Sequence, residues 1–412
     1  MEETLIGIDV GTTKICALVG EVEDPEEERL RIIGVGVAPS QGLRKGMVVN
    51  VEDAARAIGA AVDKAERVSG YDIDRAYVGV TGEHISALNS RGVVAITHGD
   101  HIVRQQDVER AIDAARAIAV PHDRKIVHAI PRYYILDGQE GLRISDPLGM
   151  QAFRLEVEVH IVTAAVTSLE NLRRAVDRAG VQVRDLVLEP WASGEAVLTK
   201  AERESGVVLA DIGGGTTDIA IFVEGNICHT FVLPVGGNHL TNDLAVLLRM
   251  PFQSAEELKV KHGHALSEAV GLDEVIEVQV FGNESRTAIP RHHVAQILEA
   301  RAQEILGLIG QQVKKSGYDG LLPAGVVVCG GTGELTGIRE LGCQVLELPV
   351  RIGVPHNLVG LVDVIHSPAY ATSVGLLLWA MRHGEEEQED LPSGPDWLPE
   401  WLMKWLKVFL PR

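Results

Sequence analysis

A glycine-rich stretch in the middle of the chain, residues 211–218 (Asp-Ile-Gly-Gly-Gly-Thr-Thr-Asp), most narrows the possible folds. Apolar, strand-like runs at 207–210 and 219–223 flank it, so the glycines occupy a tight turn between two strands. Successive residues without Cβ let backbone N–H groups close around an anion, and hydroxyls add donors. We interpret the stretch as a phosphate-binding turn, with a plain glycine-rich hairpin as the alternative.

Two carboxylates, Asp211 and Asp218, bracket this turn. Carboxylates beside a bound phosphate repel it unless a cation lies between them. Mg²⁺ prefers a few carboxylates together with water and phosphate oxygens. The residues therefore indicate a nucleotide bound together with Mg²⁺.

The same order of residues occurs near the start of the chain, at residues 5–14. There an apolar strand leads to Asp9, and Gly11, Thr12, Thr13 and Lys14 precede a second strand. An internal repeat is a signal at the level of the fold. We expect two similar sheet domains, each offering a hairpin turn to one phosphate chain held between them. Neither turn fits the Walker or the dinucleotide-binding pattern.

Five segments in this chain resemble the motifs of the actin-like ATPase superfamily. Residues 9–14 and 211–218 resemble its phosphate motifs, 187–193 and 368–375 its connecting segments, and 327–335 its adenosine motif. The resemblance implies an α/β fold with a duplicated core of two βββαβα domains, and ATP with Mg²⁺ as cofactors. It implies Asp9 and Asp211 as metal-binding residues, and as nucleotide-binding residues Gly11, Thr12, Thr13, Lys14, Gly213, Gly214, Gly215, Thr216, Glu256, Lys259, Gly330, Gly331 and Thr332.

Two acidic residues have roles that depend on this resemblance. Glu189 follows a strand, and the resemblance implies that it positions the attacking water in phosphoryl transfer, with Asp211 as the second catalytic residue. A surface carboxylate before Pro190 is the alternative.

Glu256 and Lys259 share a helix face because they are three residues apart. The resemblance pairs them with the nucleotide ribose; a solvated ion pair is the alternative.

The two halves stop matching at residues 83–165. Strand patterns at 86–97, 125–136 and 153–163 accompany an amphipathic helix at 105–118, as in a compact α+β insertion. An insertion at this point resembles the FtsA family of bacterial cell-division proteins, in which it is called subdomain 1C, an SHS2 domain. A generic α+β insertion is the alternative.

The predicted organisation has six parts. They are domain 1A (1–82 and 166–204), subdomain 1C (83–165), domain 2A (205–239 and 306–383), subdomain 2B (240–305), an acidic flexible linker (384–395) and an amphipathic helix (396–412). Helices are expected to begin at Asp53, at capping boxes in 167–170 and 254–257, and at Trp191, and to span 241–248, 295–314 and 369–381. A strand is expected at 346–352.

Composition limits the possible partners and compartment. The formal net charge of −20 argues against nucleic-acid binding, which needs clustered Lys and Arg. Cys16, Cys228 and Cys329 lie in apolar runs, so we expect small core residues in a reducing cytoplasm. The chain enters a strand almost at once, so no signal peptide is expected. No apolar run approaches the roughly 18 residues of a membrane span.

The C-terminal segment, residues 396–412, carries three of the five tryptophans. On a helical wheel its apolar side chains cover most of the circle, and lysines occupy the narrow remainder. We interpret it as a helix in a membrane interface; docking on the protein's own core or on a partner are the alternatives. The membrane-contacting residues are predicted to be Trp397, Trp401, Trp405, Leu406 and Phe409.

The resemblance implies a function in assembly rather than in metabolism. The chain would form filaments on the cytoplasmic face of the cell membrane at the division site, with at most weak ATPase activity. It would bind the C-terminal tail of the tubulin-like protein FtsZ through subdomain 2B and recruit later division proteins. A pilus-assembly or other actin-like scaffold ATPase and a sugar kinase of the same superfamily are the alternatives.

Overall fold

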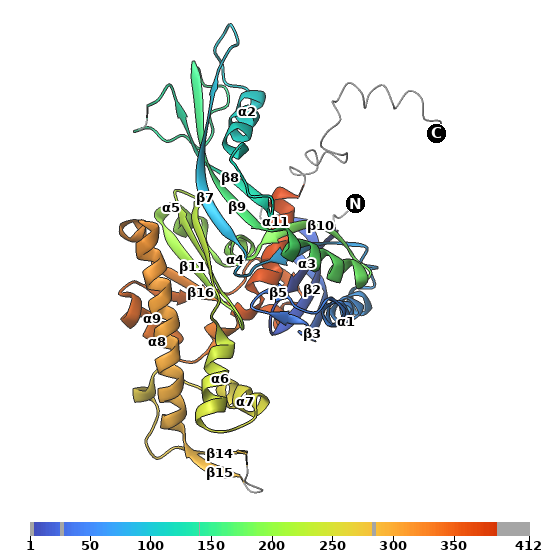
Figure 1. The fold of residues 1–412 in the computed structure, drawn as a ribbon, viewed down its shortest axis with the longest axis vertical. Coiled ribbons are helices and arrows are strands. Elements are labelled where there is room, and N and C mark those ends of the chain that lie inside the picture. Colours follow the sequence, from blue (N-terminus) through green and yellow to red (C-terminus); the bar gives the residue numbers. More distant parts are fainter. Residues whose placement is uncertain (1–3, 25–28, 140, 282–285, 385–412) are drawn as a thin grey trace.

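Two β-sheets form the centre of the molecule in a computed structural model, which describes residues 4–24, 29–139, 141–281 and 286–384 (Figure 1). The first sheet has the strand order β10-β6-β1-β2-β3-β18 and the second β13-β12-β11-β16-β17. In each, three antiparallel strands joined in sequence are followed by a parallel neighbour of the first strand. The repeat seen in the sequence is therefore a repeat of the fold. Residues 385–412, which include the predicted C-terminal helix, lie outside the described residues.

The strands of the two sheets have these bounds. The first sheet contains β1 (Thr4–Val10), β2 (Lys14–Asp24), β3 (Arg29–Pro39), β6 (Arg75–Val80), β10 (Gln182–Leu188) and β18 (Leu358–Gly360). The second contains β11 (Val207–Ile212), β12 (Thr217–Val223), β13 (Asn226–Leu233), β16 (Val326–Cys329) and β17 (Val350–Ile352). Only the end of the expected strand 346–352 is extended, because Leu346 is the last residue of helix α9 (Ile338–Leu346).

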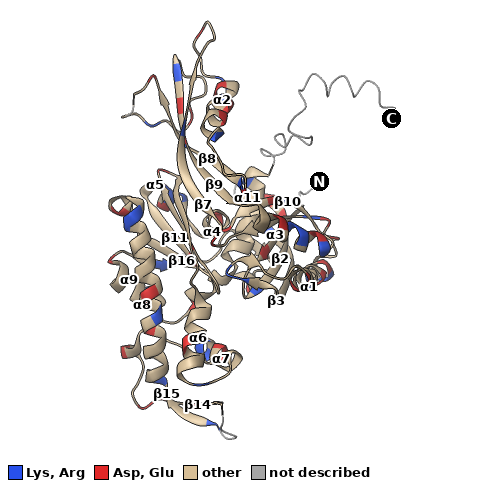
Figure 2. Ribbon diagram, viewed as in Figure 1, with Lys and Arg blue, Asp and Glu red and all other residues tan. Residues whose placement is uncertain are grey.

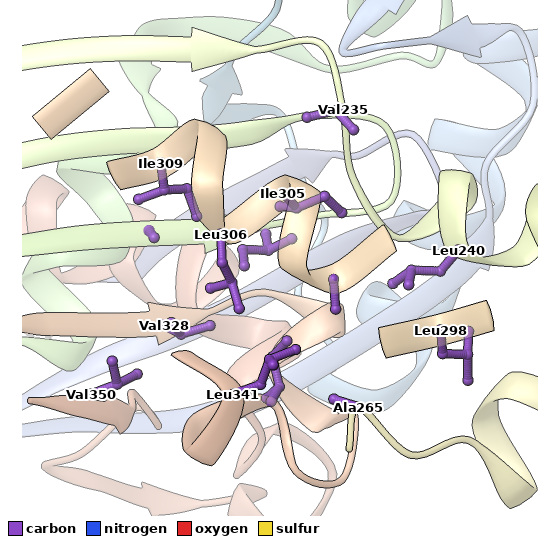
Figure 3. Packing of buried hydrophobic residues seen from close by; sticks show 14 of the residues in the cluster. Val235, Leu240, Ala265, Leu298, Ile305, Leu306, Ile309, Val328, Leu341 and Val350 are labelled. Carbon is purple, nitrogen blue, oxygen red and sulfur yellow. The ribbon is translucent and has the colours of Figure 1, made fainter. Parts of the chain in front are cut away.

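Helices cover both faces of the sheets. Helices α1 (Val51–Ser69) and α3 (Val166–Arg178) bury their apolar stripes on the first sheet. On the second, α6 (Gly237–Leu247) and α8 (Arg291–Ser316) form the outer layer with α9. In Figure 3, Ile305, Leu306 and Ile309 of α8 extend over the sheet that carries Val328. Figure 2 shows Lys and Arg interspersed with Asp and Glu on the outer sides of α1 and α8.

Several expected helix starts were wrong, each for a local reason. Asn50 caps α1, accepting hydrogen bonds from the N–H groups of Glu52 and Asp53, so the helix begins at Val51. Helix α3 begins at Val166, directly after a strand, and Val166 N–H donates to Asp123 O at 2.9 Å. Helix α7 (Phe252–His262) begins after Pro251. Neither α3 nor α7 has a side-chain cap, so both expected capping boxes are absent.

The insertion is a three-stranded sheet with one helix, as its sequence pattern predicts. Its strands have the order β7-β9-β8, with β7 (Ser86–Ala95), β8 (Arg124–Leu136) and β9 (Arg154–Ala165), and α2 (Gln105–Arg116) packs on them. In Figure 1 it extends away from the end of the molecule that carries the hairpin β14 (Val275–Val278) and β15 (Thr287–Pro290). The domain boundaries drawn from the sequence stay predictions.

The insertion also contacts the edge strand β13 of the second sheet. Asn226 Nδ2 donates to Arg132 O at 2.8 Å, and Asn89 Nδ2 donates to Cys228 O at 3.3 Å. His160 Nε2 lies 3.0 Å from Thr230 Oγ1. The insertion therefore touches the second half although it is inserted in the first.

Helices α4 (Glu189–Val197) and α11 (Ala371–His383) lie between the two sheets and pack against both. Helix α4 begins at Glu189 rather than Trp191, with Pro190 in its first turn, and the chain continues through a separate helix α5 (Lys200–Ser205). The two helices cross closely, since a Cβ built on Gly375 would lie 1.9 Å from the carbonyl oxygen of Ala192. In the described part of the chain no helix is long and apolar enough to cross a membrane.

We predict that Gly375→Ala destabilises the protein because the added methyl group forces α4 and α11 apart. Overpacking of this kind typically costs about 1–3 kcal/mol in the free energy of unfolding. Gly307→Ala on α8 is the matched control, since a Cβ there meets no heavy atom within 4 Å and Ala is the better helix former by up to about 1 kcal/mol. Urea denaturation should show opposite shifts; equal stability of the two variants would contradict the crossing geometry.

Candidate functional site

The two glycine-containing turns face each other between the halves. Residues 11–13 link β1 to β2, and residues 213–216 link β11 to β12, both as antiparallel hairpins. A Cβ on Gly214 would lie 2.0 Å from Thr13 Oγ1, and one on Gly215 would lie 2.7 Å from Thr12 Oγ1. The backbone at these two glycines therefore lies directly against the side chains of Thr12 and Thr13.

The N-terminus of α6 supports the second turn. Gly237 N–H donates to Gly213 O, and Asn238 N–H donates to Gly214 O, each at 2.8 Å. Gly213 N–H donates to Thr216 O within the turn at 3.0 Å. These bonds hold the turn's carbonyl groups away from the space that a phosphate would enter. A helix N-terminus also favours a nearby anion.

Asp9 and Asp211 are buried beneath the turns and held by hydroxyl groups. Ser373 Oγ donates to Asp9 Oδ2 at 2.8 Å. Ser193 Oγ and Thr372 Oγ1 donate to Asp211 Oδ2 at 2.6 and 2.9 Å. Burial raises the pKa of Asp9 from 3.8 to about 6 and also raises the pKa of Asp211. The structure thus brings the two predicted metal-binding residues to one buried place.

Two further carboxylates belong to the same cluster. Burial raises the pKa of Glu189 well above its ordinary value, and Asp9, Asp218 and Asp211 raise it further. Burial raises the pKa of Asp218 from 3.8 to about 7, although a hydrogen bond from Thr81 Oγ1 opposes this. Within the described ranges, no group of three or more His, Cys, Asp or Glu side chains is arranged to hold a metal ion. Two carboxylates with phosphate and water oxygens remain a suitable set for Mg²⁺.

Glu189 lies against strand β6 at Gly79, where an added Cβ would be tightly packed. A Cβ on Gly79 would lie 3.1 Å from Glu189 Cγ and 3.2 Å from Glu189 Oε1. Glu189 Oε1 has no hydrogen-bond partner among the described residues. A buried carboxyl oxygen without a partner is free to bind a water molecule or a ligand.

The predicted nucleotide-binding residues outside the turns form three groups: Lys14, the pair Glu256 and Lys259, and the adenosine motif. Lys14 Nζ lies 3.2 Å from the ring centroid of Tyr370, and burial lowers the pKa of Lys14 while Asp9 opposes the shift. Lys259 Nζ bonds Glu256 Oε2 at 2.7 Å and Gly237 O at 3.3 Å, so this pair stands beside the N-terminus of α6.

The adenosine motif is the third group. Gly330 has φ +79, and a Cβ there would lie 2.4 Å from Asp211 Oδ1. Thr332 Oγ1 lies 3.4 Å from Gly213 O, so this segment reaches the second phosphate turn. A Cβ on Gly331 would meet no heavy atom within 4 Å, which leaves open space over its backbone.

Comparisons with known proteins show to which family the chain is similar. The chain matches the family description "Cell division protein FtsA" over residues 208–375 and "SHS2 domain inserted in FTSA" over residues 82–163. It is 44% identical over 393 residues to the cell division protein FtsA of Pseudomonas aeruginosa, covering 95% of this chain and 93% of that one. The chain belongs to the FtsA family. The FtsA proteins of Neisseria meningitidis serogroup B (43%, 90% and 88% covered) and Bacillus subtilis (39%, 92% and 84% covered) are also similar.

Solved structures confirm the actin-like fold of this FtsA-family chain. A PilM–PilN type IV pilus biogenesis complex aligns with a TM-score of 0.64 at 15% identity, covering 92% of this chain and 99% of that one. MreB 5 of Spiroplasma citri bound to AMPPNP aligns with a TM-score of 0.57 at 15% identity, covering 94% and 99%. Such identities show the fold alone.

Sequence reasoning missed the hydroxyl groups that hold the aspartates of this FtsA-family site. Ser193, Thr372 and Ser373 lie in the two connecting segments, but nothing in their spacing shows that they donate to residues far away in the chain. Thr81 was also missed, and Asp218 was singled out only as a flanking carboxylate. A search for hydroxyl residues within the connecting segments could have found the first three.

We predict that Asp218→Asn changes how stability depends on pH. In the wild type the folded state keeps this proton up to about pH 7, whereas the unfolded chain releases it near 3.8. Stability is therefore lost as pH rises between these values, by at most about 1.4 kcal/mol per pH unit. The Asn variant lacks this loss. The difference between its free energy of unfolding and that of the wild type should therefore grow in its favour from pH 5 to pH 7 and then level off.

Urea denaturation of the nucleotide-free protein at several pH values measures the difference. Asp113→Asn, at an exposed position on α2, is the control. The difference between its free energy of unfolding and that of the wild type should not vary with pH. A constant offset for Asp218→Asn would show that Asp218 is ionised in the folded protein.

Proposed function

We propose that the chain binds ATP with Mg²⁺ between its two halves. The observation that carries this is the meeting of the two turns, where Gly214 and Gly215 leave only backbone beside Thr12 and Thr13. The phosphates would lie against the N–H groups of both turns, with Lys14 in reach. The solved structure of MreB 5 of Spiroplasma citri is bound to AMPPNP, which supports this class of ligand for the shared fold.

The remaining predicted residues fit the rest of such a ligand. The adenine ring would lie over Gly331, and the ribose would face Glu256 and Lys259. Asp9 and Asp211 would hold the Mg²⁺, which when bound offsets the negative charge of phosphates and carboxylates. Their hydroxyl donors, Ser373 for Asp9 and Ser193 with Thr372 for Asp211, fix the orientation of both carboxylates before a ligand arrives.

Glu189 is the residue that we expect to orient the attacking water. Its Oε1 is buried without a hydrogen-bond partner in the described part of the chain, and burial, followed by the neighbouring carboxylates, raises its pKa. A carboxyl group that holds its own proton cannot accept one from that water molecule, so a raised pKa of Glu189 would slow hydrolysis. This agrees with a protein whose nucleotide controls assembly and whose ATPase activity is weak at most.

The chain is an actin-like cell-division protein by family. We infer that it assembles into filaments on the cytoplasmic face of the cell membrane at the division site, anchors FtsZ there and recruits later division proteins. Exposed apolar side chains on α6 and α7 support predicted subdomain 2B as the surface for the FtsZ C-terminal tail: Val246, Leu247, Phe252 and Val260 are 65%, 62%, 47% and 71% exposed. The cell-division relatives favour this function over pilus assembly or sugar phosphorylation.

Gly214→Val should abolish ATP binding, because a branched side chain would occupy the space between the turns. Isothermal titration with ATP and Mg²⁺ should detect no binding, while the circular dichroism spectrum keeps its native form. Gly99→Val is the control, since a Cβ at Gly99 meets no heavy atom within 4 Å. Unchanged affinity of the Gly214 variant would contradict the assignment of the phosphate site.

The C-terminal segment should bind membranes mainly through apolar burial. At roughly 25 cal/mol per Å² of apolar surface, even partial burial of its Trp, Leu and Phe side chains yields several kcal/mol. Attraction to anionic lipid contributes only about 1 kcal/mol per basic residue. Trp401→Glu with Trp405→Glu should therefore release the protein from vesicles, whereas Lys404→Gln with Lys407→Gln should only weaken binding.

Sedimentation with vesicles that contain anionic lipid compares the two double variants, and ATP affinity should be the same in both. A larger effect of the lysine pair would make the segment an electrostatic anchor. No effect of either pair would mean that the segment binds a protein.

A further inference from the structure

The edge strand of the first sheet ends next to the insertion. Strand β10 is the outermost strand of its sheet, so one side of it has no strand neighbour. At its last residue, Leu188 N–H donates to His128 Nε2 at 3.1 Å. His128 belongs to β8 of the insertion and is 1% exposed. A side chain of the insertion thus satisfies a backbone group that the sheet itself leaves unpaired.

Aromatic side chains fix the orientation of the His128 ring. The ring centroid lies 5.0 Å from that of Trp191 on α4, at an interplanar angle of 84°, and 5.7 Å from that of Trp379 on α11. Because Nε2 accepts the bond from Leu188, it carries no proton, and a neutral ring has its proton on Nδ1. The ring is therefore held in one tautomer and one direction between the two crossing helices.

Leu188 directly precedes Glu189, and it is the N-cap residue of α4. The side chain of Leu188 makes no capping bond, so the backbone geometry at this residue sets the first turn of the helix. Glu189 has little freedom of its own, since it lies flat on Gly79. Because Glu189 is the next residue, a shift of the Leu188 amide would also change the place of the Glu189 carboxyl group.

The strand that carries His128 also contacts the second half of the molecule. Arg132, four positions further along β8, accepts a hydrogen bond from Asn226 at the start of β13 through its carbonyl oxygen, at 2.8 Å. A displacement of the insertion relative to the second half acts on β8, and His128 transmits it to Leu188. The path joins the insertion to the candidate catalytic carboxyl group through two hydrogen bonds and one strand.

We propose that His128 is a positioning residue, which sets the place of Glu189 through the Leu188 amide and so lets the insertion control the rate of ATP hydrolysis. This inference rests on the proposed nucleotide site and adds to it a control point inside the insertion. A partner that moves the insertion would then change hydrolysis without touching the nucleotide.

The test compares His128→Phe with His128→Gln. Phenylalanine keeps an aromatic ring between Trp191 and Trp379 but cannot accept a hydrogen bond, whereas the glutamine side-chain oxygen reaches a position similar to that of Nε2. In the Phe variant kcat for ATP should fall by about 10- to 100-fold, while the Kd for ATP changes by less than about threefold. The Gln variant should recover most of the lost kcat. His122→Phe, on an exposed loop of the insertion, is the control and should leave both constants unchanged.

Hydrogen exchange gives a second readout that does not depend on turnover. The Leu188 amide should exchange faster in the Phe variant and be protected again in the Gln variant. Loss of this protection with an unchanged kcat, or equal kcat losses in the Phe and Gln variants, would overturn the proposal.

If the wild type binds ATP but does not hydrolyse it, the hydrolysis part of the proposed function is refuted, and the role of His128 needs a test that does not depend on hydrolysis. The place of Glu189 would then be read from the ¹³C resonance of its carboxyl group, assigned with Glu189→Gln. Titration of that resonance should shift in the Phe variant and not in the Gln variant. An identical titration in both variants would overturn the role of His128.

Discussion

Four carboxyl groups buried at the junction of the halves are the constraint on which this structure depends. Asp9, Asp211, Asp218 and Glu189 each have a raised pKa, and burial is the largest cause for every one of them. Like charges in a place with little water are unfavourable unless protons, hydroxyl donors or a cation offset them. In this protein hydroxyl groups on α4 and α11 provide the donors, so the helices between the sheets serve as the support of the acidic cluster. The close crossing at Gly375 fits this arrangement, because a hydroxyl group from each helix bonds Asp211.

This arrangement links closure of the halves to the arrival of a cation. Without one, burial raises the pKa of all four carboxyl groups, so keeping them buried costs folding free energy as the pH rises. A bound cation with phosphate oxygens replaces those protons and makes the ionised carboxylates favourable. Thr81 of the first half bonds Asp218 of the second, so the charge state of one carboxyl group affects a contact between the halves. Ligand binding and the relative placement of the halves therefore share one set of side chains.

Local patterns in the sequence were enough to predict those parts of the fold that depend on residues close together in the chain. The turns at 11–13 and 213–216, the insertion and the long helix α8 follow from glycine spacing and apolar periodicity. The capping boxes predicted for α3 and α7 failed, because a preceding strand and Pro251 decide where those helices begin. Strand β18 was not predicted, since its three residues pair with β3 at the other end of the chain. The hydroxyl ligands of the aspartates, such as Ser373 on Asp9, likewise depend on contacts between distant residues that no periodicity encodes.

The contact between the insertion and β13 includes hydrogen bonds that water can replace. Burial lowers the pKa of His160 to about 3, so its ring is neutral, and it bridges Asn89 and Thr230 through hydrogen bonds without an ionic component. A neutral hydrogen bond contributes about 1 kcal/mol net, because water replaces it when the contact opens. The ion pair between Arg143 and Glu224 also crosses this contact, at 3.1 Å, but both side chains are exposed, so it adds at most about 1 kcal/mol. A nucleotide would open or close this contact only by the difference between its affinities for the two arrangements of the halves, and a few kcal/mol of difference would suffice. His128 is as buried as His160, but the rings of Trp191 and Trp379 also pack against it, so aromatic packing adds to the hydrogen bond that holds the insertion to β10.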